Sequence, residues 1–163
     1  MSDPSQSLDT PKPIKKLRLL DYINLALNKN YMLWILITSG AEGLEKSLGF
    51  DYGAGKSTEG LWLLCDSVYA GNWNKTRHAT VGAYWEIKRI LDECLTGCYF
   101  DEIELTLGKH QQHNPEVREL AYYMKTVRPY TKIWIASAPH RDTLQKDFRE
   151  MFHFEIIISE RGI

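Results

Sequence analysis

The 163-residue sequence has few cysteines, no long apolar run and almost no net charge. Its three cysteines, Cys65, Cys94 and Cys98, are an odd number without the spacing of a disulfide framework, which favours a reducing, intracellular setting. The longest apolar run, at residues 31–37, is far shorter than the roughly 20 residues that a membrane-spanning helix needs. Residues 1–13 contain no apolar core of a secretory signal. We therefore expect a cytoplasmic protein without a membrane partner.

The charge balance excludes a strong field around the whole protein. Twenty basic residues stand against twenty-one acidic ones, which gives a formal net charge of -1, so no overall field attracts nucleic acid or anionic lipid. A small basic run could touch a phosphate backbone, or it could simply begin a solvated helix: Lys12, Lys15, Lys16 and Arg18. The shares of apolar residues (44%) and charged residues (25%) exclude collagen-like and wholly disordered chains. At this length we expect a flexible tail over residues 1–13 and one domain over residues 14–163.

Two kinds of apolar pattern alternate along the chain. Apolar runs predict buried strands at residues 31–38, 98–100, 132–137 and 154–159, with a weaker one at 79–81. Apolar residues at helical spacing predict helices at residues 14–28, 55–69, 84–95, 115–127 and 142–151. Strands that alternate with helices of this length predict an α/β fold with a parallel sheet.

A glycine-rich segment lies where a loop meets the second predicted helix, and it reads Gly53-Ala54-Gly55-Lys56-Ser57-Thr58. Glycines let backbone N–H groups curl around a phosphate without a Cβ in the way, and the helix N-terminus adds its dipole. A lysine at this place brings a mobile charge to the phosphates, and the next hydroxyl can bind Mg²⁺. The segment resembles the Walker A motif of P-loop NTPases. That resemblance implies that residues 53–58 bind the phosphates of ATP, with Lys56 as a catalytic residue and Ser57 on the metal.

The match to the Walker A consensus is incomplete. The first glycine of the consensus is missing, and a long stretch separates the motif from the preceding predicted strand. A second near-match at residues 40–47 has the expected spacing, but Glu45 replaces its last glycine. A carboxylate there would repel phosphates, so we favour Lys56 over Lys46, with residues 41–51 as an insertion or a reshaped phosphate loop. The alternative is that the motif is a chance glycine turn.

Two acidic residues, Asp101 and Glu102, follow the short apolar run Cys98-Tyr99-Phe100. This arrangement resembles the Walker B motif of the P-loop division with a catalytic glutamate, the RecA-like and AAA+ ATPases. The resemblance implies that Asp101 holds Mg²⁺ through water and that Glu102 polarises the attacking water. The alternative is a solvated turn at the end of a strand.

Further polar residues match the same division. Its members carry a polar sensor for the γ-phosphate on the strand between the Walker A and Walker B strands. Ser137, at the end of the predicted strand 132–137, occupies the matching place, although a serine that opens the following Ala-Pro turn accounts for it equally well. Arginines near the ends of late elements are candidate arginine fingers, and the sequence does not choose among them: Arg128, Arg141 and Arg149.

The resemblance spans about residues 32–159. It implies a three-layer P-loop NTPase fold with strand order 5-1-4-3-2, which binds and hydrolyses ATP with Mg²⁺. In its small size the chain is similar to compact ATPases of archaeal viruses and plasmids. Three functions stay open: an ATP-driven remodeller of DNA or protein, including as a homo-oligomeric ring; a kinase-like phosphotransferase; and a nucleotide-binding module without hydrolysis. The lack of a clear guanine-binding signature favours ATP over GTP.

One other group of residues has the composition of a zinc site: Cys94, Cys98, His110 and His113. Cys94 falls on the buried face of a predicted helix and Cys98 begins a predicted strand, so core packing accounts for both cysteines better. We expect the two histidines in a solvated loop after Glu102, where they could also touch DNA or a neighbouring subunit.

Overall fold

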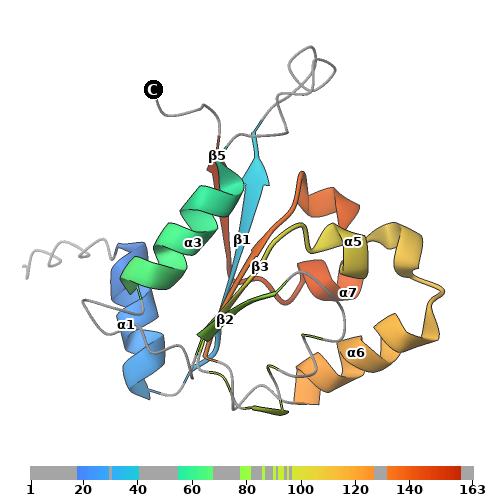
Figure 1. Cartoon of the computed structure of the whole chain (residues 1–163), viewed down its shortest axis with the longest axis horizontal. Helices are drawn as coiled ribbons and strands as arrows, with labels where there is room; N and C mark the ends of the chain where they lie inside the picture. Colours follow the sequence, from blue (N-terminus) through green and yellow to red (C-terminus); the bar gives the residue numbers. More distant parts are fainter. Residues whose placement is uncertain are drawn as a thin grey trace, which may run out of the picture.

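A computed structural model describes residues 18–29, 31–40, 55–67, 78–81, 86, 90, 92–93, 95, 97–126 and 132–158. The expected tail (residues 1–13), the expected insertion (41–51) and most of the predicted helix at 84–95 lie outside the described residues. Within the described part, a parallel sheet carries helices on both faces (Figure 1). The α/β class with a parallel sheet, predicted from the apolar patterns, is confirmed.

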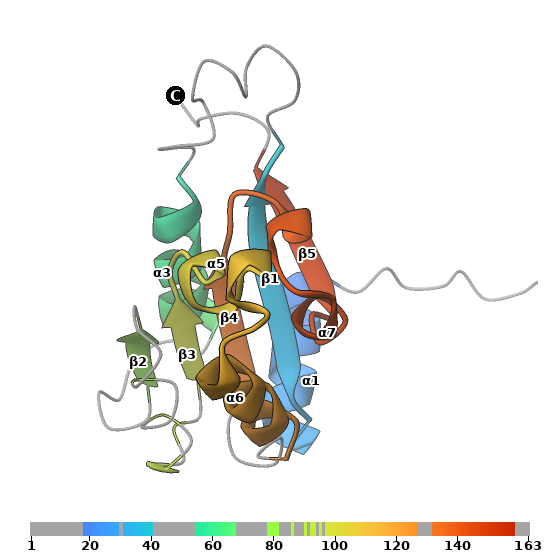
Figure 2. The ribbon, with the colours of Figure 1, turned by 90° about the vertical axis from the view of Figure 1, so that its right-hand side faces the viewer.

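The sheet has five strands: β1 (Leu33–Ser39), β2 (His78–Val81), β3 (Gly97–Phe100), β4 (Ile133–Ser137) and β5 (Phe154–Ile158). Their order is β2-β3-β4-β1-β5, and every neighbouring pair is parallel (Figure 2). Read from the opposite edge, this order is 5-1-4-3-2. β4 therefore lies between β1 and β3.

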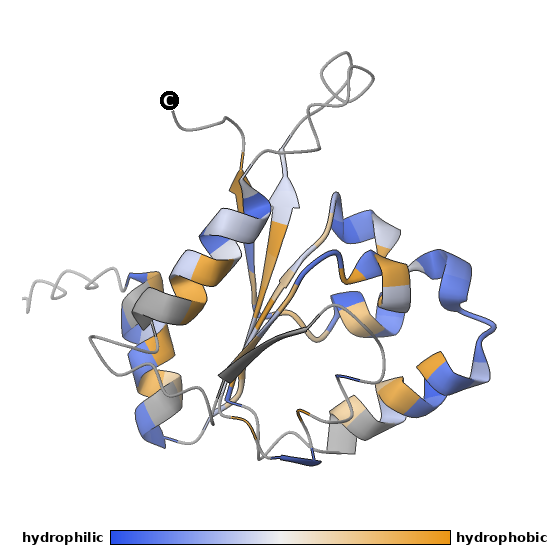
Figure 3. Cartoon of the chain, in the orientation of Figure 1, coloured by the Kyte–Doolittle hydropathy of each residue, from blue (hydrophilic) through white to orange (hydrophobic). Residues whose placement is uncertain are grey.

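The central strands are buried along their whole length, because helices cover both sides of the sheet. This burial is the reason why β1 and β4 read as continuous apolar runs, and Figure 3 shows the hydrophobic stretch along β1. In the register of these two strands Trp34 lies beside Trp134, and their rings stack with centroids 5.0 Å apart. The indoles fill the core between the sheet and the helices on that face.

Two helices, α1 (Leu19–Lys29) and α3 (Lys56–Ser67), cover one face of the sheet. Three others cover the opposite face: α5 (Glu104–Leu107), α6 (Pro115–Thr126) and α7 (Lys146–Arg149). The α6 helix begins where the sequence predicts, with the Asn114 side chain accepting a hydrogen bond from the backbone N–H of Glu116 at 3.0 Å. None of the described helices combines the length and the apolar character needed to cross a membrane.

The segment after β4 differs from the single helix predicted at residues 142–151. Arg141–Thr143 forms a 3-10 turn, and the α-helical part is only α7. Between them Leu144 has an extended backbone, is completely buried and forms an antiparallel bridge with Gly108. The prediction of one continuous helix is wrong because this bridge to the end of α5, distant in sequence, holds Leu144 out of a helical conformation.

Candidate functional site

Polar residues from three elements meet at the carboxyl ends of β3 and β4. Asp101 directly follows β3, and Ser137 is the last residue of β4. Ser57 lies in the first turn of α3, which packs against these strands. In open parallel sheets, the crevice outside the carboxyl ends of the strands is the usual place for ligands.

The carboxylate of Asp101 connects these elements through hydrogen bonds. Its Oδ1 accepts from the Ser137 hydroxyl at 2.5 Å, from the Tyr99 hydroxyl at 2.7 Å and from the Glu102 backbone N–H at 3.2 Å. The Ser57 hydroxyl lies 2.9 Å from Oδ2 and 3.1 Å from Oδ1. Ser57, Asp101 and Ser137, which the sequence singles out separately, are thus brought together by the fold.

These hydrogen bonds set the charge of the carboxylate. Burial alone would raise the pKa of Asp101, but the hydrogen bonds from the Ser137, Tyr99 and Ser57 hydroxyls and from the Glu102 backbone outweigh it. The pKa of Asp101 therefore lies below its ordinary value, and the group is a carboxylate at neutral pH. An ionised carboxylate beside a serine hydroxyl is the kind of oxygen donor that Mg²⁺ prefers, so Ser57 and Asp101 fit this ion.

Gly55 shapes the start of α3. Its φ of +92° lies in the left-handed region that favours glycine, and its carbonyl accepts the helical hydrogen bond from the N–H of Glu59 at 2.9 Å. Residues 56–58 form the first turn of α3, and the positive end of the helix dipole at this turn suits an anion. Of the other motif residues, Lys56 is partly exposed and Thr58 is exposed. Gly53 and Ala54 lie outside the described residues, as does Lys46.

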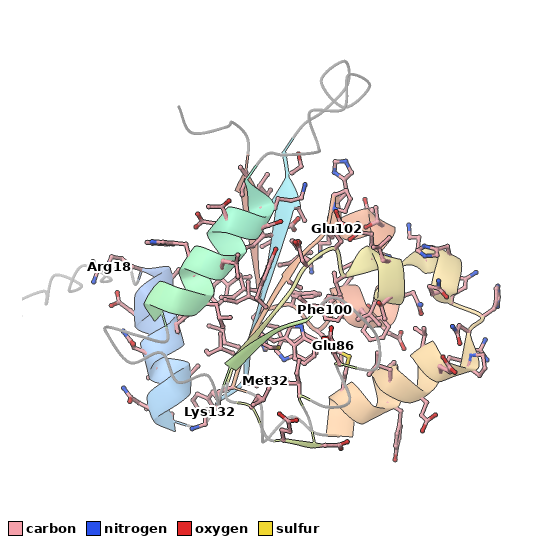
Figure 4. All side chains as sticks on the ribbon, in the orientation of Figure 1. Arg18, Met32, Glu86, Phe100, Glu102 and Lys132 are labelled. Atoms are coloured by element: carbon pink, nitrogen blue, oxygen red, sulfur yellow. The ribbon has the colours of Figure 1, made fainter. Side chains whose placement is uncertain are left out.

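Glu102 stands in an unusual backbone conformation. Its φ is +47°, in the left-handed region that residues with a Cβ seldom adopt. The turn is held to the end of β4, because the N–H of Glu102 donates to the Ser137 hydroxyl at 3.0 Å and that of Ile103 donates to the Ser137 carbonyl at 2.9 Å. The Glu102 side chain is exposed at the end of β3, near the start of α5 (Figure 4).

The sequence reasoning missed the role of Tyr99, which it placed only in an apolar run. Its side chain is 2% exposed, and its hydroxyl reaches both Asp101 and Ser137. A Cβ added to Gly60 of α3 would overlap this ring, so the ring lies directly against the helix backbone. Two signals in the sequence point to this contact: a tyrosine two residues before Asp101, hence on the same strand face, and a glycine inside a helix.

Glu104 is a second residue that the sequence reasoning missed. Burial raises the pKa of its carboxyl, and the negative charges of Glu102 and Asp101 act in the same direction, whereas a hydrogen bond from its own backbone N–H and the charge of Lys56 oppose them. Its Oε2 is buried and makes no hydrogen bond within the part of the chain that the structure describes. Glu104 therefore adds a half-buried carboxyl group to the surroundings of the candidate site.

The candidate arginines that the structure describes are engaged within the chain. Arg141 forms an ion pair with Glu155 at 3.3 Å and donates to the carbonyl of Arg149 at 3.0 Å. Arg149 in turn pairs with Asp142 at 2.6 Å. The third candidate, Arg128, lies outside the described residues.

The residues considered for zinc do not form one cluster among the described residues. Cys98 is completely buried in the core, where burial raises the pKa of its thiol. His110 and His113 are exposed, in the 3-10 turn and the loop between α5 and α6. Cys94 lies outside the described residues. Core packing accounts for Cys98, as the sequence pattern indicates.

Comparison with known proteins gives matches among solved structures, whereas no protein-family model and no curated protein matches the chain. PCH-2 from C. elegans matches with a TM-score of 0.55 and 11% identity, over 88% of this chain and 41% of that one. A DNA replication initiation factor matches with a TM-score of 0.53 and 12% identity, over 85% of this chain and 44% of that one. A third match, the FIGL-1 AAA domain in complex with ADP, has a TM-score of 0.46 and 15% identity, over 77% of this chain and 42% of that one.

At such low identities the likeness concerns the fold alone. The first two matches support an α/β fold of the P-loop NTPase kind with a parallel sheet for this chain. The chain spans less than half the length of each of these three structures. These likenesses do not test the similarity to ATPases of archaeal viruses and plasmids, which stays a prediction.

Proposed function

We propose that this chain binds ATP with Mg²⁺ at the carboxyl ends of β3 and β4 and hydrolyses it. The hydrogen bond between Ser57 and Asp101 carries the proposal. It joins the Ser57 hydroxyl, in the first turn of α3, to the Asp101 carboxylate, which follows β3, although the two residues are far apart in sequence. Both oxygens suit one magnesium ion, and the adjacent helix N-terminus suits the phosphates that the ion accompanies. The P-loop fold agrees with this arrangement.

We assign a role to each residue of the candidate site. The backbone N–H groups of residues 53–58 and the Lys56 ammonium would bind the phosphates, and Ser57 and Asp101 would hold Mg²⁺. The ion, when bound, would neutralise charge on the phosphates. Glu102, exposed to solvent beside Asp101, would orient the attacking water and accept its proton. Ser137, at the end of β4, would donate a hydrogen bond to the γ-phosphate.

The binding step is tested with lysine variants. Lys56→Ala removes a charge-assisted contact to the phosphates, and such contacts are worth about 1.5–3 kcal/mol, so affinity for MgATP should fall about 10- to 150-fold. Lys109→Ala, at an exposed lysine of the turn after α5, is the matched control and should bind as wild type does. If Lys46→Ala alone weakened binding, the phosphate loop would be residues 40–47. Wild-type protein that binds no nucleotide would overturn the proposal.

The hydrolytic step is tested with two neighbouring glutamates. Glu102→Gln should retain MgATP binding and lose most of the turnover, because the amide cannot accept the proton from water. Glu104→Gln changes a carboxyl group two residues away, at the start of α5, and should retain turnover. If Glu104→Gln abolished hydrolysis and Glu102→Gln did not, the catalytic role would belong to Glu104. If the wild type bound ATP tightly but did not hydrolyse it, the alternative function would be favoured, a nucleotide-binding module without hydrolysis.

We further propose that hydrolysis drives the remodelling of DNA or protein by an oligomer of this chain. One of the fold neighbours is a DNA replication initiation factor, which makes DNA the first partner to test. Hydrolysis measured with and without DNA, at several protein concentrations, tests both parts of this proposal. Stimulation by DNA and a rate that rises with assembly would support it. Transfer of phosphate to a small acceptor in preference to water would favour the kinase-like alternative instead.

A further inference from the structure

Ser137 has a single hydroxyl proton, and in this structure it donates that proton to the Asp101 carboxylate. Its Oγ donates to Oδ1 of Asp101, with the two oxygens 2.5 Å apart. The same Oγ also accepts from the N–H of Glu102 at 3.0 Å. A Ser137 that donates to a γ-phosphate must therefore release Asp101. Releasing a half-buried carboxylate without a substitute donor costs free energy.

The Tyr99 hydroxyl donates to the same oxygen, which also accepts from the Ser57 hydroxyl and the Glu102 N–H at longer distances. It lies 2.7 Å from Oδ1 of Asp101 and 3.1 Å from Oγ of Ser137. It has one proton, and the shorter contact to a charged acceptor is the stronger one, so this proton goes to Asp101. Oδ1 of Asp101 thus keeps a hydroxyl donor when Ser137 turns away.

The packing of the ring keeps this donor in place. Tyr99 is 2% exposed, and Gly60 of α3 leaves just enough space for the ring, since any Cβ there would overlap three ring carbons. The strand on one side and the helix backbone on the other prevent the hydroxyl from swinging away.

We infer that Tyr99 is a positioning residue: its hydroxyl holds the Asp101 carboxylate and so frees the proton of Ser137 for the γ-phosphate. This inference rests on the proposed function and deepens it. Asp101 keeps its orientation towards Ser57 and the metal through Tyr99, while Ser137 changes its acceptor. Without the Tyr99 hydroxyl, a Ser137 that turns to the phosphate would leave Oδ1 of Asp101 with only its two longer contacts, to the Ser57 hydroxyl at 3.1 Å and to the Glu102 N–H at 3.2 Å.

Tyr99→Phe tests the inference, because it keeps the ring against Gly60 and removes only the hydroxyl. We expect kcat for ATP hydrolysis to fall about tenfold or more, while KM for MgATP changes less than about threefold. The reason is that Tyr99→Phe weakens the hydrogen bond from Ser137 to the γ-phosphate that reacts, whereas the groups that bind the other phosphates stay in place. Tyr122→Phe, at a tyrosine of α6 that is 71% exposed, is the matched control and should leave both constants unchanged.

A double-mutant cycle separates positioning from a general structural effect. If Tyr99 acts through Ser137, Tyr99→Phe should lower kcat little further in a Ser137→Ala background. The inference is overturned if Tyr99→Phe leaves kcat unchanged, or if its effect multiplies in full with that of Ser137→Ala. In either case the wild type still hydrolyses ATP and the proposed function stands. A wild type that neither binds nor hydrolyses ATP would overturn the proposed function and this inference together.

Discussion

Replacing Gly60 with alanine should destabilise this protein, although the same change usually stabilises a helix. Gly60 is buried within α3, and an ideal Cβ there would overlap Cε2 of Tyr99 and lie 2.6 Å from Cδ2 and 2.7 Å from Cζ of the same ring. All three of these contacts are shorter than 3.0 Å, a separation that real Cβ atoms essentially never show. Because the ring is itself buried between α3 and the sheet, it cannot turn into solvent to avoid the new methyl group.

Two opposing effects set the magnitude. Alanine favours a helix over glycine by about 1 kcal/mol. Overpacking a closed core costs about 1–3 kcal/mol, because side chains leave their rotamers and the backbone shifts. The overlap here involves three ring carbons, so we place the cost in the upper part of that range. We expect Gly60→Ala to lower the free energy of unfolding by about 1–2 kcal/mol.

Urea unfolding followed by circular dichroism measures this difference. Asn24→Ala, at an exposed position of α1, is the control for helix propensity and should stabilise the protein by a few tenths of a kcal/mol. In a Tyr99→Leu background, which removes the ring, Gly60→Ala should instead be neutral or stabilising. A Gly60→Ala protein as stable as wild type, or more stable, would refute the reasoning about this contact.

Three further predictions concern other buried or paired groups. Because the pKa of Asp101 is lowered on folding, its contribution to stability is complete above the ordinary aspartate pKa of about 3.9 and is lost as pH falls through the folded value. The stability difference between wild type and Asp101→Asn, measured by urea unfolding, should therefore shrink below about pH 4. A difference that does not change with pH would contradict this prediction. Glu155→Gln should cost about 0.5–1 kcal/mol by losing the ion pair with Arg141, and unfolding measured at high salt should show a smaller cost. Cys98, buried and with a raised thiol pKa, should resist alkylation in the native protein and react in urea, as peptide mass mapping would show; rapid native labelling would contradict its burial.

The strands were the most predictable part of this fold. Both β1 and β4 are buried on two faces, so almost every residue in them is apolar, and a continuous apolar run of that length is typical of such a strand. The segment at 142–151 was less predictable. Its residues have a helical pattern, but the bridge between Leu144 and Gly108 depends on a segment far away in the sequence. The residue pattern within one segment does not predict a contact with a distant segment.

The candidate site also contains residues that the sequence predicts and one that it does not. Ser57, Asp101 and Ser137 were each chosen because they resemble P-loop motifs at the ends of predicted strands or the start of a predicted helix, and in a parallel sheet those places lie at one edge. Tyr99 was not chosen, because a tyrosine in an apolar run reads as core. Its hydroxyl becomes a partner of Asp101 only when α3 packs on β3 and Gly60 admits the ring.

The alternation of strands and helices, the parallel sheet and the residue types available for binding phosphate and metal can all be derived from the order of the amino acids. These features follow from periodicity and from side-chain chemistry, which are local properties of the chain. Which hydroxyls share the Asp101 carboxylate, and which face of α3 carries the glycine that fits Tyr99, depends on how the folded elements pack. Hydrogen bonds form over about 3 Å, and distances that short between distant parts of the chain exist only once the helices and the sheet have packed together.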